Sequence, residues 1–203
     1  MTVSWTPHRF AGGALALDTA NTVVLRGDSQ RSFDRFADPA EIARFARAAS
    51  TFRASELGGR TLVVSDPEAV SPLVLSIREA TDRLFRGFVL SGSASAGDAA
   101  ELLRLCADGL AAARGEGLFA PGRPFGDPSE PLAFEAALAV SALSLLTGTA
   151  IARIRICPNC NWLFLDRSRN SSRLWCDMAV CGNRQKASRH YRRRKAVREV
   201  DDA

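Results

Sequence analysis

The chain has 203 residues, of which 46% are hydrophobic, and a formal net charge of +5. This length fits one medium domain, or one domain with a small appendage, and the apolar content is sufficient for a packed core. No apolar run approaches the roughly 18 residues of a membrane helix, so we expect a soluble, cytoplasmic protein without a membrane partner.

The charge is unevenly distributed along the chain. Residues 150–203 contain thirteen basic and five acidic side chains, whereas residues 1–149 contain fourteen basic and seventeen acidic ones. Arginine is abundant throughout, with 25 arginines against two lysines, so its clustering is more informative than its number. The basic C-terminal quarter indicates a polyanionic partner.

Turn signals divide the first 150 residues into helices. Residues 13–23 predict a short, mostly buried helix. The runs Asp38-Pro39-Ala40-Glu41 and Ser65-Asp66-Pro67-Glu68 are two helix starts, each with a capping aspartate and a proline in the first turn. The first leads into an apolar stripe over residues 42–49, and the second into a longer helix whose apolar positions continue to Phe88.

A loop and a third clear helix follow. Small residues from Ser91 to Gly97 predict the loop, and the spacing of apolar residues from Leu102 to Leu110 predicts the helix. Cys106 lies within this helix, and we expect it to be a buried apolar side chain rather than a nucleophile. The glycine- and proline-rich stretch from Gly115 to Pro131 reads as another loop.

Residues Leu132 to Leu146 are apolar on nearly every side, which is typical of a central, buried helix. We expect Gly148 to end it. The strand signal before residue 150 is limited to Thr61–Val64, which could equally be the entry to a helix. The sequence therefore predicts a mainly α protein, in which residues 1–149 form a bundle of four to six helices.

Three polar residues interrupt the apolar N-terminal segment. Asp18, Asn21 and Thr22 fall within one helical turn, so they predict a buried polar cluster that something must pair. They could cap a neighbouring helix or fix a loop. Alternatively, they could line a pocket for a small-molecule effector, which would make the helical domain a sensor.

The pattern changes after residue 150, where a small module begins. Residues Ile151–Ile156 alternate with a period of two, and Trp162–Asp166 form a second short aromatic strand. We expect a hairpin that turns around Pro158 and Asn159. A polar, basic connection, Arg167–Arg173, follows it.

Four cysteines lie within this module. Cys157 and Cys160 form a first pair, and fifteen residues separate it from Cys176 and Cys181. Two pairs joined by a loop of this length can surround one tetrahedral ion, and four thiolates describe a closed, structural Zn²⁺ site, one per chain. The alternative is two disulfides, which need an oxidising compartment.

The cysteine motifs resemble those of the CGNR zinc-finger family. The resemblance rests on Cys157-Pro158-Asn159-Cys160, on Trp175-Cys176 and on Cys181-Gly182-Asn183-Arg184. In that family the zinc module follows a helical domain called ABATE, described as a stress-induced transcription regulator, and residues 12–22 resemble the start of that domain. The resemblance implies that all four cysteines bind zinc, and that the chain divides into an ABATE-like domain, 1–149, and a zinc module, 150–203.

The last segment predicts a basic helix that Cys181 opens. Eight basic residues between Arg184 and Arg198 occupy most of the helix circumference, so this helix cannot be buried along its length. It either projects into solvent or binds phosphates. The nucleic-acid contacts predicted here are Asn183, Arg184, Gln185, Lys186, Arg189, Arg192, Arg193, Arg194 and Lys195.

Single residues of the module admit other roles. Arg155 or Arg184 could simply neutralise the charged zinc site. Tyr191, Trp162 and Trp175 could stack on unpaired bases, although the tryptophans are better explained as packing for the small module. DNA is favoured over RNA through the family description.

The most consistent function is a zinc-dependent transcription regulator that binds nucleic acid, with the helical domain as sensor or assembly domain. A zinc-stabilised protein-interaction module and an RNA-binding protein are the alternatives. We expect no enzymatic activity, because a closed thiolate site leaves no coordination position open and no phosphate-binding loop or nucleophile elbow is present.

Overall fold

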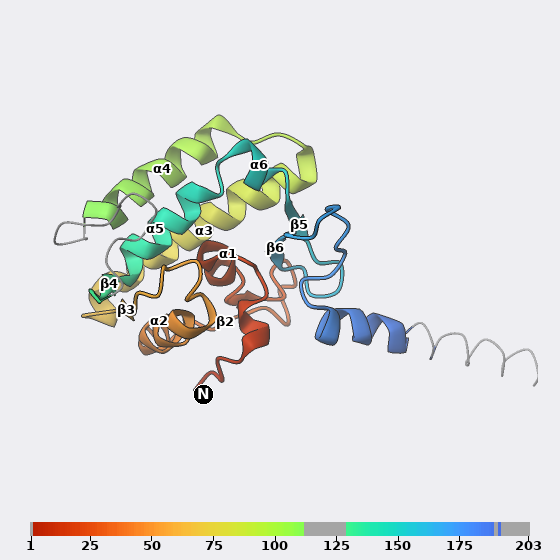
Figure 1. Ribbon diagram of the computed structural model, residues 1–203, viewed down its shortest axis with the longest axis horizontal. Coiled ribbons are helices and arrows are strands. Elements are labelled where there is room, and N and C mark those ends of the chain that lie inside the picture. The colour runs from red at the N-terminus through yellow and green to blue at the C-terminus, as the bar shows by residue number, and fades with distance from the viewer. Residues whose placement is uncertain (1, 112–128, 189–190, 192–203) are drawn as a thin grey trace, which may run out of the picture.

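One almost wholly apolar helix, α5 (Phe134–Ser144), lies at the centre of the N-terminal part of the chain. The computed structural model describes residues 2–111, 129–188 and 191. Two longer helices, α3 (Pro67–Ser91) and α4 (Ala96–Ala111), run alongside α5, and the short α1 (Leu15–Ala20) packs against α3 and α5 (Figure 1). The prediction of a buried central helix in a mainly α bundle is confirmed.

Both predicted helix starts are present, but an aspartate is the N-cap only at α3. The Asp66 carboxylate accepts a hydrogen bond from the Ala69 amide at the start of α3. In α2 (Ala40–Phe52) the N-cap is Pro39 instead of the expected Asp38, whose carboxylate accepts a hydrogen bond from the Ala40 amide at 2.9 Å from one residue further out. Gly92, in the left-handed region with φ 77°, ends α3.

Two short strand pairs replace parts of predicted helices. The helix expected over residues 13–23 ends at Ala20, and β1 (Val23–Val24) then pairs antiparallel with β2 (Phe33–Asp34). The helix expected from Leu132 begins two residues later, because β4 (Leu132–Ala133) pairs parallel with β3 (Leu62–Val63). The second pair confirms the strand signal at Thr61–Val64, and its partner is distant in sequence.

The prediction that Gly148 ends the central helix is wrong. Helix α5 stops at Ser144, and Gly148 is the first residue of a further short helix, α6 (Gly148–Ile151). The Thr147 hydroxyl causes this restart, since it accepts a hydrogen bond from the Ala150 amide and so caps α6. The strand expected from Ile151 consequently begins at Ile154. Most of the loop expected between Gly115 and Pro131 lies outside the described residues.

The predicted C-terminal hairpin is present and shares the main core. Strands β5 (Ile154–Ile156) and β6 (Leu163–Leu165) pair antiparallel, with Ile154 opposite Leu165 and Ile156 opposite Leu163. Both Ile154 and Leu163 are buried among the core residues of the helical part. The hairpin therefore completes the helical core.

Hydrogen bonds from the N-terminal segment fix the outer edge of β6. The Asn21 amide donates to the Leu163 carbonyl at 2.8 Å, and its oxygen accepts from the Leu163 amide at 2.9 Å. Two residues further, the Leu165 amide donates to the Gly12 carbonyl at 2.7 Å. Segments 142 residues apart thus pair almost like neighbouring strands.

None of the helices among the described residues is both long and apolar enough to cross a membrane.

Replacing Gly13 by alanine should destabilise the protein by roughly 2 to 4 kcal/mol. Gly13 has a φ of +85°, and an added Cβ would lie 3.2 Å from the Leu165 carbonyl oxygen and Cβ. Gly27→Ala is the matched control, since Gly27 has a φ of +94° but nothing lies within 4 Å of the added atom. The control should cost about 1 kcal/mol of backbone strain. Urea unfolding measures the free energy of unfolding of both variants. Equal losses of stability in the two would show that the contact between residue 13 and β6 is unimportant.

Candidate metal centre and its surroundings

The four predicted cysteines come together in one cluster. The sulfur atoms of Cys157, Cys160, Cys176 and Cys181 all lie within 4.8 Å of one another. The Sγ atoms of Cys160 and Cys176 are 3.5 Å apart, and those of Cys176 and Cys181 are 3.6 Å apart. A disulfide needs about 2 Å, whereas sulfurs around a tetrahedral Zn²⁺ with bonds of about 2.3 Å lie about 3.8 Å apart. The arrangement fits an ion and excludes the disulfide alternative.

A tight turn positions the first pair. The Cys157 amide donates to the Trp162 carbonyl at 2.8 Å, which closes the end of the hairpin, and the Asn161 amide donates to the Cys157 carbonyl at 2.8 Å. Asn161 itself is in the left-handed region, with φ 61°. The backbone amides of Asn159 and Cys176 support the Cys157 sulfur, as expected of metal-bound thiolates.

Without a cation, the cysteine thiols would hydrogen-bond to one another and could not all be ionised. Hydrogen bonds from the Cys160 and Cys176 thiols lower the pKa of Cys157. The same contacts raise the pKa values of Cys160 and Cys176, because their protons are held by the neighbouring sulfur. Four thiolates can be ionised at this separation only around a positive charge. The donor set therefore fits Zn²⁺, whose chemistry in a closed site of this kind is structural.

A wide turn carries the second pair. The residues Met178–Gly182 form a π-helical turn, η2, and Asp177 caps it by accepting hydrogen bonds from the amides of Ala179 and Val180. Cys181 lies inside this turn rather than at its start, so the expectation that Cys181 opens the last helix is wrong. The cap at Asp177 starts the helical segment earlier, which directs the Cys181 sulfur back toward Cys176.

His8, a residue of the short helix η1 (Pro7–Phe10), contacts a residue near each cysteine pair. His8 Nδ1 lies 2.8 Å from the Asp177 carboxylate, and the His8 ring stacks on Trp162 with 5.3 Å between ring centroids. Asp177 belongs to the second pair's turn, whereas Trp162 follows the first pair. His8 thus connects the two halves of the cysteine cluster.

Trp162 packs the module, as expected for the tryptophans. It is 5% exposed and lies against the cysteine cluster, and the guanidinium of Arg35 is 5.5 Å from the centre of its ring. Burial, followed by repulsion from Arg9, lowers the pKa of Arg35 to about 10. Trp175 is partly buried against the same cluster, whereas Tyr191 is exposed.

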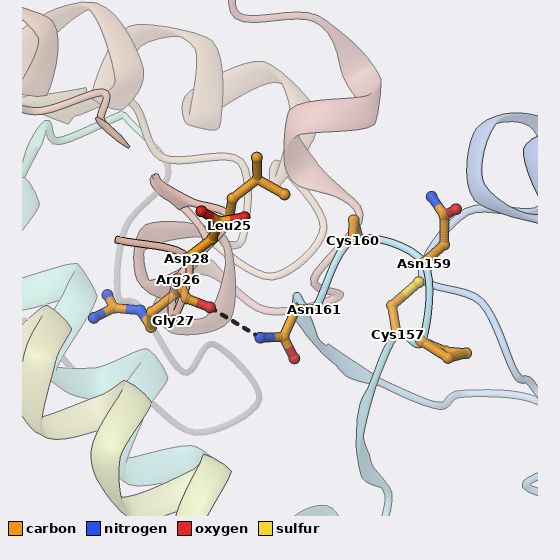
Figure 2. Close-up of a pocket in the computed structure, with 9 residues that line it drawn as sticks. Leu25, Arg26, Gly27, Asp28, Cys157, Asn159, Cys160 and Asn161 are labelled. Carbon is orange, nitrogen blue, oxygen red and sulfur yellow. Dashed lines mark hydrogen bonds between the residues drawn. The ribbon is translucent and has the colours of Figure 1, made fainter. Parts of the chain in front are cut away.

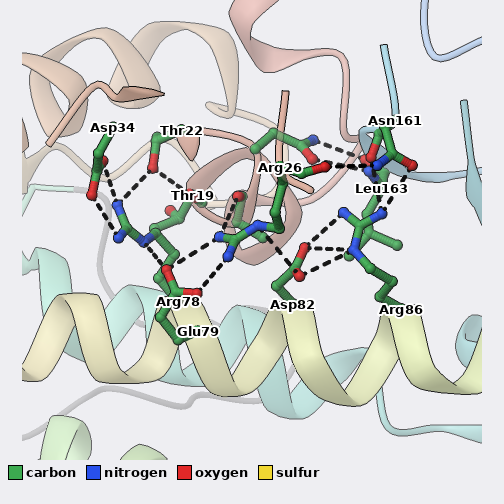
Figure 3. Close-up of polar contacts among 12 residues, drawn as sticks. Thr19, Thr22, Arg26, Asp34, Arg78, Glu79, Asp82, Arg86, Asn161 and Leu163 are labelled. Atoms are coloured by element: carbon green, nitrogen blue, oxygen red, sulfur yellow. Dashed lines mark hydrogen bonds and ion pairs between the residues drawn. The ribbon is translucent and has the colours of Figure 1, made fainter. Parts of the chain in front are cut away.

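Helix α3 also contacts the turn that carries the first cysteine pair, through Arg86. Arg86 donates to the carbonyl and to the side-chain oxygen of Asn161, at 3.0 and 3.2 Å, while Asp82 binds the same guanidinium (Figure 3). The Asn161 amide in turn donates to the Arg26 carbonyl at 3.1 Å. A row of arginines and carboxylates along α3 therefore ends at the residue directly after Cys160.

The first pair borders an open hollow of about 390 Å³. Residues 25–28 form one wall and residues 157–161 the other, and Figure 2 shows the two segments facing each other. Cys160 is partly exposed, whereas Cys157, Cys176 and Cys181 are buried. Cys106 is also buried, far from the cluster in sequence, and burial raises its pKa to about 11, which suits an inert core residue.

The polar cluster of the N-terminal segment is buried and paired within the chain. Asp18 accepts hydrogen bonds from the Gly12 amide at 2.7 Å and from Arg53 Nε at 2.5 Å. Asn21 pairs with the backbone of Leu163, and the Thr22 hydroxyl donates to the Thr19 carbonyl at 2.7 Å. These contacts are those of a cluster that fixes loops and the hairpin, the first of the two alternatives considered above.

The predicted nucleic-acid contacts are only partly within the described residues. Residues 183–188 form an α-helix directly after η2, with Asn183, Arg184 and Lys186 exposed. Gln185 is half-buried, and its side-chain amide donates to the Asn159 oxygen at 3.0 Å. The remaining predicted contacts, Arg189, Arg192, Arg193, Arg194 and Lys195, lie outside the described residues.

Sequence reasoning missed the residues that attach the cluster to the helical part. Asp177 was detectable, since an aspartate before small residues is a helix-cap signal. Arg86 and His8 gave no local signal, because their partners are distant in the sequence.

Two family profiles match the chain. The profile of the CGNR zinc finger matches residues 153–194. The profile of ABATE, with the description "Putative stress-induced transcription regulator", matches residues 13–149, which is more than half of the chain. Both matches agree with the resemblance noted at the cysteine motifs and at the N-terminal segment. No curated protein shows a significant match.

Replacing Cys176 by serine should abolish stoichiometric zinc binding, since its sulfur lies inside the cluster, 3.5 Å from that of Cys160 and 3.6 Å from that of Cys181. Purified wild-type protein should contain one zinc per chain by elemental analysis, and the variant should also unfold at lower urea concentration. Cys106→Ala is the matched control and should keep its zinc. A Cys176→Ser variant with full zinc content and unchanged unfolding would contradict the four-ligand site.

Stability should depend on the titration of Asp18. Burial raises its pKa to about 7, although Arg53 acts in the opposite direction. The folded state therefore binds a proton that the unfolded state, with a pKa of about 4, releases, so the stability contribution declines as pH rises from about 4 to 7. Between about pH 5 and 8, wild type should lose on the order of 2 kcal/mol relative to Asp18→Asn.

Urea unfolding in excess zinc at the two pH values measures this difference. Asp28→Asn is the control, because Asp28 is partly exposed and a hydrogen bond from Arg31 lowers its pKa, which places its titration below the measured range. Parallel pH profiles for wild type and Asp18→Asn would show that Asp18 does not titrate in this window.

Proposed function

The chain belongs to the ABATE family and carries a CGNR zinc finger after its helical domain, and on that premise we propose that it is a zinc-dependent regulator that binds nucleic acid through the finger. In this proposal Zn²⁺ is structural, and the centre has no catalytic role, because four thiolates leave no open coordination position. Retention of free thiols suits the reducing cytoplasm, which we propose as its location.

A basic helix that begins on the metal centre supports this proposal most directly. Arg184 and Lys186 are exposed on the helix 183–188, which directly follows the ligand Cys181 and its turn. Metal binding would therefore order the base of this helix. Three more arginines of the module, Arg167, Arg169 and Arg173, are exposed on the connection between the cysteine pairs. Such a surface favours phosphate backbones through counterion release.

The roles of the helix residues follow from their contacts. Gln185 is committed to Asn159, so we assign it to orienting the helix on the first cysteine turn. Asn183 and Arg184 lie at the start of the helix, where side chains reach base edges when a helix enters the major groove. This geometry suits duplex DNA, which we favour over RNA, whose narrow major groove excludes a helix.

The helical domain supplies a fixed base for the finger. His8 with Asp177, Asn21 with Leu163, and Arg86 with Asn161 join the two parts at three separate points. A change in the helical domain can therefore reorient the exposed basic helix. We propose this as the physical link between sensing and binding in a regulator responding to stress.

A protein-docking role is the second candidate, and one observation favours it. Leu174 and Met178, on either side of Cys176, are 67% and 54% exposed. Apolar side chains exposed beside a zinc site can dock another protein, and such an interface would not weaken steeply with salt.

Nucleic-acid binding should weaken with salt and depend on Arg184 and Lys186. Fluorescence anisotropy of the full chain with zinc, against duplex DNA, single-stranded DNA and RNA, should show a steep decrease in affinity as salt rises. The double variant Arg184→Gln, Lys186→Gln should bind duplex DNA roughly tenfold more weakly, with a salt slope smaller by about 2.

The matched control removes two exposed arginines of the helical domain, Arg31 and Arg104, by the same change to glutamine. This control should bind as wild type does. Absence of binding to every probe at low salt would refute the proposal and leave the protein-docking role.

A further inference from the structure

A second hollow lies where the helical part meets the connection between the cysteine pairs. Its volume is about 320 Å³. Phe10 and Arg53 contribute one side, Leu165 at the end of β6 and the two arginines Arg167 and Arg173 contribute the other. A volume of this size suits a small ligand rather than a single water.

The lining of this hollow is rich in hydrogen-bond donors that remain free. Arg53 uses Nε for Asp18 and one terminal nitrogen for the Phe10 carbonyl, and Arg167 uses one terminal nitrogen for the Gly13 carbonyl at 2.8 Å. Arg173 donates to the carbonyls of Trp175 and Cys176. Among the described residues, each of the three guanidinium groups keeps at least one N–H nitrogen without a partner.

Carboxylates offset only part of this positive charge. Glu56 accepts hydrogen bonds from the Leu15 amide at 3.0 and 3.1 Å and from the Ser141 hydroxyl at 2.5 Å, so both of its oxygens are engaged. The Glu56 carboxylate lies 3.9 Å from Arg53 Nε. Asp18 lies behind Arg53 and is 1% exposed, so it is not accessible to a ligand. Asp18 and Glu56 thus offset the charge of Arg53, whereas among the described residues no ion pair engages Arg167 or Arg173, so the hollow keeps a net positive charge.

We propose that this hollow binds a small oxyanion, a ligand with phosphate or carboxylate groups. Arginine is suited to such groups because its planar fork can donate two parallel hydrogen bonds. The ligand would contact Arg53 of the helical part and Arg167 and Arg173 of the metal-bearing module at the same time.

Such a ligand would act on the metal centre through Arg173. This side chain donates to the carbonyl of the ligand Cys176 and its guanidinium is 5.4 Å from the centre of the Phe164 ring. An anion that binds Arg173 would compete with, or reinforce, the hydrogen bond from Arg173 to the Cys176 carbonyl. This bond orients the second cysteine pair. Only this regulatory consequence rests on the proposed function, since anion binding itself requires no nucleic acid.

Isothermal titration of the zinc-loaded full chain with inorganic phosphate and with 3-phosphoglycerate, at constant ionic strength, tests the site. We expect saturable binding of one anion per chain, and Arg167→Gln should weaken it about tenfold. Arg169→Gln is the matched control, because Arg169 is exposed on the same connection but does not line the hollow. Zinc content verifies that each variant keeps its fold. Arg173→Gln removes another guanidinium group from the hollow and should also weaken anion binding.

Several outcomes would overturn the inference. No saturable binding of either probe at millimolar concentration would exclude an oxyanion site, and so would equal weakening by Arg167→Gln and Arg169→Gln. If Arg167→Gln weakens duplex DNA binding as much as phosphate binding, and phosphate displaces DNA, these arginines belong to the nucleic-acid interface and not to a ligand site. Phosphate binding that persists when DNA binding is absent would support the site while refuting the proposed function.

Discussion

The pairing of the Asn21 side chain with the backbone of Leu163 is the contact on which the arrangement of both parts depends. Strand β6 has β5 on one side, and on its other side the amide of Asn21 and the carbonyl of Gly12 take the place of a neighbouring strand. Asn21, Leu163 and Gly12 are buried, so each of their polar groups would cost about 1–3 kcal/mol if left unpaired. These bonds therefore fix the position of the hairpin on the helical part. The first cysteine pair, which lies in the turn of the hairpin, is fixed with it.

The metal centre inherits this fixed position. A cysteine cluster on a flexible tail would let its basic helix sample many orientations, whereas here His8 and Arg86 contact the two turns that carry the ligands. The four cysteines of the cluster are thus local in sequence, but the residues that orient the cluster come from the helical part. Coordination and orientation are separate properties of this molecule, and substitutions can change one without the other.

The same division explains how much could be predicted from the sequence. The cysteine cluster and the hairpin follow from short-range spacing, and the start of α3 follows from a capping aspartate, Asp66, that acts within one turn. The pair β3–β4 joins residues about 70 positions apart, and His8 and Asp177 are separated by 169. No local pattern encodes such partners. The prediction that Gly148 ends the central helix was wrong because the Thr147 cap outweighed the tendency of glycine to end a helix.

The sharing of Ile154 and Leu163 with the helical core has a consequence for biosynthesis. A ribosome exposes α1 long before it exposes β6, so Asn21 and Gly12 emerge with their backbone partners still untranslated. Until the hairpin leaves the exit tunnel, the nascent helices retain an exposed apolar site, and the polar groups that later pair with β6 are hydrated. Chaperones that recognise exposed apolar surface would then meet this chain between the emergence of α5 and that of β6 from the tunnel, and docking of the hairpin would end that interval.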